Sequence, residues 1–190
     1  MTEPTLRSLA KADRRQALLD AAAQQFAQRG FTRVSLEDLG AAVGVSGPAV
    51  YRHFAGKQAV LGALLVGVSE GLWAGGQTVV ARAPDDATAL TALVQFHVNF
   101  AMTNADVIRV QDHDLDSLTD EDRHSVRALQ RSYVELWVDV LRRLQPDEER
   151  PALRTRAHAA FGLINSTPHS GSTRETPAIL ERMALAALRA

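Results

Sequence analysis

Apolar residues recur every three or four positions along most of the chain, which is the spacing of amphipathic helices. In the first such run, residues 13–28, arginines and glutamines separate the apolar positions, and Gly30 stands where a capping glycine would end the helix. We therefore predict a first helix that ends near Gly30. Its buried face is predicted to consist of Leu18, Leu19, Ala22, Ala23 and Phe26.

Two short helices are predicted next. Ser35 can cap a helix over residues 36–43, and Asp38 three positions later supplies the aspartate form of a capping box. Gly44 breaks that helix, and Ser46 can cap a third helix of about two turns that runs to Phe54. Two helices joined by such a turn are typical of a helix-turn-helix, whose second helix enters the major groove of DNA.

The remainder of the chain continues the helical pattern. Residues 104–118 are expected to be irregular or to form one short helix. The other predicted helices cover residues 57–83, 87–102, 120–144, 148–166 and 176–189. Alanine, leucine and arginine favour helices, whereas aromatic residues, which favour strands, make up 5% of the chain. We predict an all-α fold of about nine helices.

Composition narrows the class of protein. The 190 residues are 46% hydrophobic, which is typical of a globular chain, and they include no cysteine. Without cysteine there are no disulfides, thiolate zinc sites or cysteine nucleophiles, and a reducing cytoplasm is the natural location. The polar N-terminus does not resemble a signal peptide, and no apolar run approaches the ~20 residues needed to cross a membrane. We expect a soluble cytoplasmic protein.

Charge is distributed unevenly along the chain. The net charge is −1, but residues 1–60 hold eight Lys or Arg against five Asp or Glu, a balance of +3. Residues 61–190 hold thirteen against seventeen, a balance of −4. The N-terminal part alone therefore has a balance that suits DNA phosphates.

The segment from Arg14 to Leu61 closely resembles the DNA-binding domain of the TetR family of transcriptional regulators. Three stretches carry the resemblance: FAQRGF at residues 26–31, LGAAVGVS at residues 39–46, and VYRHFAGK at residues 50–57. The resemblance implies a helix-turn-helix domain over residues 1–56, with a flexible basic arm over about 1–12. It also implies a helical ligand-binding and dimerisation domain over residues 57–190.

The resemblance assigns DNA contacts residue by residue. Ser35, Ser46 and Gly47 place hydroxyls and amides at helix starts, where phosphates dock. Arg52 is the one expected base-contacting side chain that can make a bidentate guanine contact. Tyr51, Arg52 and His53 could instead be ordinary packing or surface residues. The full set of expected DNA contacts is Arg33, Ser35, Ser46, Gly47, Pro48, Ala49, Tyr51, Arg52, His53 and Lys57, with Arg7, Lys11, Arg14 and Arg15 of the arm as further basic residues.

The same resemblance implies a ligand cavity and a homodimer. Large or polar residues on otherwise apolar helices are the pocket candidates, although ordinary core packing is the simpler explanation for each of them taken alone. These are Trp73, Phe96, His97, Phe100, Met102, Tyr133, Trp137, Phe161 and Asn165. The last two helices supply apolar faces for a dimer or for the core of one chain. The dimer candidates are Leu163, Ile164, Ile179, Leu180, Met183, Ala184 and Leu188.

Other possible chemistry is weakly supported. Residues 67–71 fit the G-x-S-x-G pattern of a hydrolase nucleophile, but that device needs a preceding strand, and the surroundings here are helical. Asp112, His113, Asp114 and Asp116 resemble loose metal ligands, yet an acidic solvated loop is the simpler interpretation. The polar run Asn165–Ser170, with His169, suggests a helix end or groups that face a ligand or a dimer partner. We predict no enzyme activity, metal or cofactor.

The sequence thus predicts a ligand-responsive DNA-binding regulator, and most simply a repressor. Two chains would place their third helices in successive major grooves of a palindromic operator, ~34–36 Å apart. A small apolar or amphipathic effector, an acyl thioester being one candidate, would release the DNA. An activator would have the same sequence features, and so would a helical ligand-binding protein that has lost DNA binding, although the intact basic N-terminal motif argues against the latter.

Overall fold

A computed structural model describes the backbone of residues 6–167 and 173–190, and the side chains within these ranges from residue 11 onward. This part of the chain contains α-helices and two short 3-10 helices, and no strand, which confirms the all-α prediction. The 3-10 helices are Phe31–Arg33 and Leu115–Ser117. The α-helices are α1 (Leu6–Arg29), α2 (Leu36–Ala42), α3 (Gly47–Val50), α4 (Lys57–Arg82), α5 (Asp86–Thr103), α6 (Ala105–Asp114), α7 (Asp120–Leu144), α8 (Arg150–Ile164) and α9 (Thr176–Arg189).

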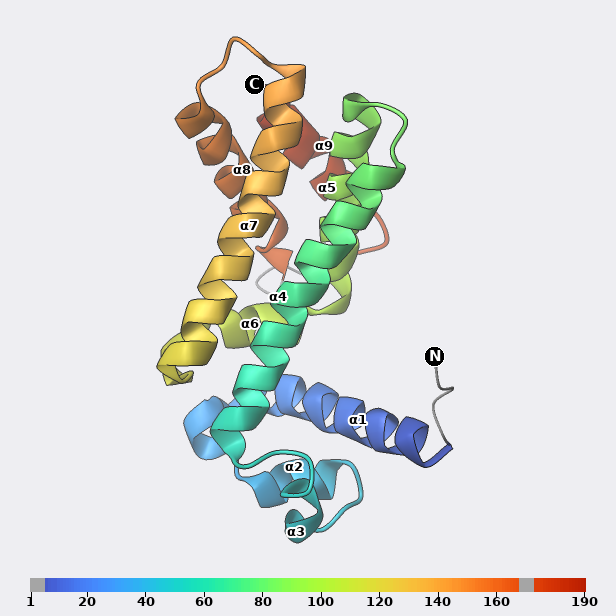
Figure 1. Cartoon of the computed structure of the whole chain (residues 1–190), viewed down its shortest axis with the longest axis vertical. Coiled ribbons are helices and arrows are strands. Elements are labelled where there is room, and N and C mark those ends of the chain that lie inside the picture. The colour runs from blue at the N-terminus through green and yellow to red at the C-terminus, as the bar shows by residue number, and fades with distance from the viewer. Residues whose placement is uncertain (1–5, 168–172) are drawn as a thin grey trace.

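The long helix α4 connects the two ends of the molecule. In Figure 1, α1, α2 and α3 form a small unit at one end, and α4 runs from that unit to the far end beside α5 and α7. Helices α8 and α9 complete the larger unit by packing against each other and against α7 and α5. Helix α6 lies between the two units and packs against α1.

Each unit has its own hydrophobic core. The core of the larger unit centres on α5, α7, α8 and α9, with Trp137 fully buried in it. The core around α1 includes Val60 and Leu65 of α4, Val110 of α6 and Val126 of α7. The small unit therefore does not close at the expected boundary of residue 56, because α4, α6 and α7 supply part of the apolar surface that α1 buries.

Three glycines shape the chain around α2: Gly30 ends α1, while Gly40 and Gly44 form the turn between α2 and α3. Gly30 and Gly44 have φ of +77° and +70°, a left-handed conformation that costs glycine no steric strain. Gly40 has a different role, since a Cβ on it would lie 2.8 Å from the carbonyl oxygen of Val45. Because Gly40 has no side chain, residue 45 can approach it closely, and the Val45 N–H donates to the Gly40 carbonyl at 2.9 Å. The predicted glycine cap and helix break are thus confirmed.

Several predicted boundaries agree with the structure, and others differ. Helices α7 and α9 begin and end as predicted. Helix α1 begins at Leu6, so residues 6–12, expected to be a flexible arm, are helical, while residues 1–5 lie outside the described part. Helix α3 ends at Val50 rather than at Phe54, because Arg52 and His53 donate to carbonyls three residues back in tighter turns. Residues 105–114 form helix α6.

Helix α4 has a further property that the sequence analysis did not anticipate. By length and composition it is apolar enough to cross a membrane, with a mean hydropathy of 1.4 over its most apolar stretch. In this structure it packs against α5, α7 and α1. Its apolar residues therefore bury surface against these helices.

Candidate functional site

Four of the expected DNA contacts meet at one open hollow of about 400 Å³ between the starts of α2 and α4, here called the α2–α4 hollow. They are Arg33, Ser35, Tyr51 and Lys57. Tyr51 is 56% exposed, which contradicts the alternative that it is a core residue. Residues separated by more than twenty positions thus present hydroxyl and cationic groups to one hollow.

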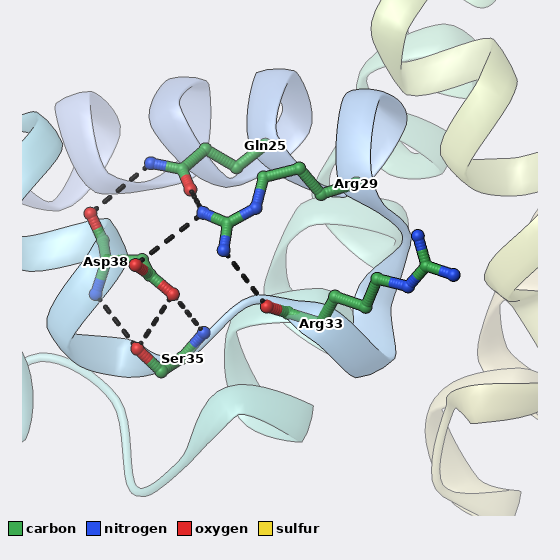
Figure 2. Close-up of polar contacts among 5 residues, drawn as sticks. All are labelled: Gln25, Arg29, Arg33, Ser35 and Asp38. Carbon is green, nitrogen blue, oxygen red and sulfur yellow. Dashed lines mark hydrogen bonds and ion pairs between the residues drawn. The ribbon is translucent and has the colours of Figure 1, made fainter.

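The Ser35 side of this hollow is held by a network of hydrogen bonds (Figure 2). The Asp38 N–H donates to the Ser35 hydroxyl at 3.1 Å, and the Ser35 N–H donates to the Asp38 carboxylate at 2.8 Å, so the predicted capping box is confirmed. These bonds from Ser35 and the nearby Arg29 hold the pKa of Asp38 below its usual value. Arg29 also donates to the Arg33 carbonyl at 3.2 Å, while the Arg33 guanidinium extends away from the network.

Lys57 has a structural role that the sequence analysis missed. Its ammonium donates to the carbonyls of Phe31 at 2.7 Å and Thr32 at 3.1 Å, and it lies 4.5 Å from the centre of the Phe31 ring. The backbone N–H of Phe31 in turn donates to Asp114 at the end of α6, and burial raises the pKa of that carboxyl group. The cation is therefore fixed at the hollow with one of its three N–H donors still available.

The remaining expected contacts lie on α3 and just after it. Ala49, Arg52 and His53 line a second, smaller hollow of about 180 Å³ together with Arg14 of α1. Arg52 is exposed. Ser46, Gly47 and Pro48 form the start of α3, where Ser46 makes no side-chain cap, contrary to the prediction. Of the basic arm, Arg15 lies over the Phe54 ring at 5.0 Å, and the side chain of Arg7 is outside the described part.

Glu37 is a further residue of this site, and it was not among the expected DNA contacts. This exposed side chain lines the α2–α4 hollow and lies against Gly47, where an added Cβ would be 3.2 Å from its Cγ. A carboxylate here opposes phosphate binding, but it can accept a hydrogen bond from the amino group of cytosine. The sequence could have indicated this position, because Glu37 comes two residues after the Ser35 cap and so lies in the exposed first turn of α2.

A cavity of about 210 Å³, here called the inner cavity, lies inside the larger unit. Five of the nine pocket candidates line it: His97, Phe100, Tyr133, Phe161 and Asn165. Ser69 of α4 and Gln111 of α6 also line the cavity but were not predicted. They come from helices whose relative positions only the fold sets. The remaining lining residues are Leu72, Ile108, Leu129, Gln130, Val134 and His158.

His97 joins the polar groups of the inner cavity into a chain. Its Nε2 lies 3.1 Å from the Asn165 amide oxygen, which can only accept, so Nε2 carries the proton. Its Nδ1 is then the acceptor for the Tyr133 hydroxyl at 3.4 Å. Burial lowers the pKa of His97 to about 4 and raises that of Tyr133, although the bond to Asn165 acts in the opposite direction on His97. Both side chains are therefore uncharged at neutral pH.

The other four pocket candidates lie elsewhere, and Met102 lines a separate hollow between α1, α4 and the start of α6. Trp137 is fully buried behind the cavity, in edge contact with Tyr133 and Phe161. Phe96 packs over Gly75, where it fills the space that a Cβ would occupy. Trp73 lines an open groove of about 1060 Å³, here called the outer groove, on α4, α7 and α8. The pocket assignment is corrected for Trp137 and Phe96, because core packing accounts for both. It stays a prediction for Trp73 and Met102, which line other hollows.

The dimer candidates divide into residues buried within one chain and residues exposed on its surface. Ile164, Leu180, Ala184 and Leu188 are buried within one chain, so their inner faces are not available to a second copy. Leu163 is half-buried against the same core. Ile179 and Met183 of α9 are 39% and 51% exposed. The prediction is thus corrected for the four buried residues and stays open for the two exposed ones.

Two family models match separate parts of the chain. The model for bacterial regulatory proteins of the tetR family matches residues 18–64, the segment that contains both helices of the helix-turn-helix. A model for the tetracyclin repressor-like C-terminal domain matches residues 85–169, which carry most of the inner cavity. The chain belongs to the TetR family. It is a transcriptional regulator with a helix-turn-helix DNA-binding domain.

Relatives within the TetR family are moderately similar. The HTH-type transcriptional repressor KstR2 of Rhodococcus jostii (strain RHA1) is 28% identical over 132 residues, which cover 69% of this chain and 65% of that protein. The match therefore spans less than two thirds of that relative. A TetR-family regulator from Bordetella parapertussis 12822 superposes with a TM-score of 0.83 at 26% identity, covering 92% of this chain and 93% of the other.

A second solved structure shows the same fold. The ketosteroid transcriptional regulator KstR2 of Mycobacterium tuberculosis has a TM-score of 0.76 at 20% identity, and the superposition covers 93% of both chains. At that identity the likeness concerns the fold alone.

The motifs that suggested other chemistry are accounted for locally. Ser69 of the G-x-S-x-G pattern lies inside α4 and donates to the Leu65 carbonyl at 2.8 Å, so it has no strand to present it. The acidic segment is the end of α6 rather than a loop, and Asp116 pairs with Arg123. Within the described residues no group of three His, Asp or Glu could hold a metal. His169 and Ser170 lie outside those residues.

Proposed function

We propose that this TetR-family protein is a cytoplasmic, ligand-responsive repressor that binds a palindromic operator as a homodimer and is released by a small apolar or amphipathic effector. The observation that carries the proposal is the separation of two sites along one long helix. An open, partly cationic hollow lies at one end of α4, and a cavity lined by no Asp, Glu, Lys or Arg lies beside its middle. Ligand binding at one site can therefore bias DNA binding at the other.

The α2–α4 hollow supports contacts to DNA phosphates that hold the protein at a fixed position along the duplex. The Lys57 ammonium is held by two carbonyls and Ser35 by its capping box, so little side-chain entropy is lost when both meet a DNA backbone. Tyr51 contributes an exposed hydroxyl. Such contacts position the protein without reading sequence, which leaves base recognition to the exposed residues of α3 and to Arg52.

The inner cavity supports an uncharged ligand group. None of its lining residues is Asp, Glu, Lys or Arg, and the pKa of His97 is well below neutral. A buried carboxylate or ammonium would lack a partner there, which is costly. A hydroxyl or carbonyl group could instead bond to the Asn165 amide or the Tyr133 hydroxyl.

Two helices connect the cavity to the DNA-binding unit. Helix α4 contributes Ser69 and Leu72 to the cavity wall and begins at Lys57. Helix α6 contributes Ile108 and Gln111 and ends at Asp114, which is bonded to Phe31 beside the Lys57 ammonium. A ligand that favours a different position of either helix would change the spacing of the recognition helices, by no more than its difference in affinity for the two states.

A mobility-shift titration with DNA flanking the protein's own gene tests DNA recognition. We expect a saturable shift that random DNA of equal length does not compete away. Arg52→Ala is expected to change base preference, whereas Lys57→Ala should weaken specific and random DNA about equally. Absence of any selective shift, with or without candidate effectors, would overturn the repressor proposal.

Transcription assays on the shifted promoter separate a repressor from an activator. We expect purified protein to lower transcript yield and an uncharged effector to restore it. Increased transcription in the presence of the protein would contradict repression while leaving DNA recognition intact.

A further inference from the structure

The short 3-10 helix Phe31–Arg33 carries the backbone from the end of α1 to the start of α2. A helical segment of three residues is too short for most of its carbonyls to find partners one turn further along the chain. Cationic side chains supply those partners here. The Lys57 ammonium donates to the first two carbonyls of the segment, and the Arg29 guanidinium donates to the carbonyl of Arg33 at 3.2 Å.

Arg29, the last residue of α1, joins three parts of the DNA-binding unit (Figure 2). One of its nitrogens donates to the Gln25 amide oxygen of α1 at 3.0 Å, and another donates to the Arg33 carbonyl. The guanidinium also lies 3.5 Å from the Asp38 carboxylate of α2. Gln25 closes the network by donating to the Asp38 carbonyl at 3.3 Å. A planar guanidinium serves several acceptors at fixed angles, which a lysine ammonium on its flexible stem cannot do as rigidly.

This network holds the backbone of residues that are expected to contact DNA. The Asp38 carboxylate accepts from both the N–H and the hydroxyl of Ser35, at 2.8 and 2.9 Å. Arg33 lines the α2–α4 hollow beside Ser35, and its guanidinium points away from the network (Figure 2). The network therefore fixes where the Arg33 side chain begins without engaging its charge.

The network has more effect on position than on stability. The side chains of Arg29 and Asp38 are 46% and 36% exposed, and an ion pair between such exposed groups contributes little to the free energy of unfolding. A contact to DNA, by contrast, depends strongly on the position of the backbone that carries it, because a hydrogen bond weakens steeply away from its preferred geometry.

We propose that Arg29 is a positioning residue for DNA binding, which does not contact DNA itself but holds the 3-10 helix and the start of α2 so that Arg33 and Ser35 meet the phosphates. This inference rests on the DNA-binding role of the helix-turn-helix. Two residues that contact DNA independently give additive losses of affinity when both are changed. A positioning residue and the residue that it positions do not.

The test measures fluorescence anisotropy with a random-sequence duplex at low salt for the unaltered protein, Arg29→Lys, Arg33→Gln and the double variant. Arg29→Lys keeps the positive charge but loses the planar fork, and we expect it to weaken DNA binding by about threefold to tenfold. Arg33→Gln should weaken binding by a similar factor on its own, but by less than about twofold in the Arg29→Lys background.

Arg82→Lys is the matched control, because it makes the same substitution at the exposed last residue of α4, far from the hollow. It should leave DNA binding unchanged. The urea midpoint of Arg29→Lys should match that of the unaltered protein, so that weaker DNA binding does not reflect a smaller folded fraction. If Arg29→Lys has less helix by circular dichroism, Gln25→Met replaces it in the cycle, because that change removes the acceptor beside Arg29 without altering charge.

The inference is overturned if Arg29→Lys binds DNA as the unaltered protein does, even with a lowered urea midpoint, because its role would then be structural alone. It is also overturned if Arg33→Gln causes the same loss in both backgrounds, as two independent phosphate contacts would. If the unaltered protein does not bind the duplex, the DNA-binding role fails together with this inference, so the two failures are distinguishable.

Discussion

At the scale of single residues, burial changes what a side chain can do. His97 would be a partly charged surface residue on an isolated helix, but here it is enclosed by Phe100, Tyr133, Trp137 and Phe161. The neutral imidazole bridges Tyr133 and Asn165 and keeps the cavity uncharged.

The buried imidazole should make the stability of the protein depend on pH. Because the pKa of His97 is about 4 in the folded chain and about 6.5 when unfolded, the unfolded state binds a proton in this interval that the folded state does not. The free energy of unfolding should therefore fall as the pH drops from about 6.5 to 4, by up to about 3 kcal/mol. Urea unfolding of the native protein and His97→Gln across this range measures the effect. Parallel curves for the two proteins would contradict it.

Glu37 places a carboxylate at the α2–α4 hollow, where it should repel DNA phosphates. Removing its charge in Glu37→Gln should raise affinity for random DNA by about threefold to tenfold at low salt, with a smaller gain at high salt. Fluorescence anisotropy with a random duplex measures this. Glu181→Gln on α9 makes the same change in net charge far from the hollow, and an equal gain in that variant would refute a local effect.

At the scale of elements, α4 packs closely against α7 because Gly76 has no side chain. A Cβ there would lie 2.6 Å from the Tyr133 ring and 3.0 Å from Leu136. By contrast, nothing lies within 4 Å of a Cβ on Gly71, which is five residues earlier on the exposed side of α4. Two glycines that the sequence cannot tell apart thus have opposite roles.

The two glycines give a paired prediction. Gly76→Ala should lower the free energy of unfolding by about 1–3 kcal/mol, because the rigid Tyr133 ring must move. Gly71→Ala should raise it by up to about 1 kcal/mol through helix propensity. Chemical denaturation of both variants tests this, and stabilisation by Gly76→Ala would show that α4 and α7 separate easily.

At the scale of the whole molecule, Ile179 and Met183 leave apolar surface on α9 that one chain does not cover. Met183→Lys should therefore shift the protein from dimer to monomer in sedimentation velocity, because a second copy would have to bury the new charge. Leu144→Lys is the matched control, since Leu144 is 37% exposed at the end of α7. If the dimer persists equally in both variants, the exposed surface of α9 is not the dimer interface.

The sequence by itself determined the elements. Helix periodicity gave the bounds of α7 and α9, and local capping chemistry gave Ser35, Asp38, Gly30 and Gly44 their roles, because such interactions join residues close along the chain. The helix-turn-helix motif was found for the same reason.

Only the tertiary structure decided which surfaces meet. It separated Ile179 and Met183 from the buried Leu180 and Leu188, joined α4 and α6 into the core around α1, and brought Arg29 of α1 beside Asp38 of α2. An apolar residue at helical spacing has the same sequence signature whether it faces its own core, a ligand or a second chain. The packing of distant helices resolves that ambiguity, because it sets which faces lose contact with water.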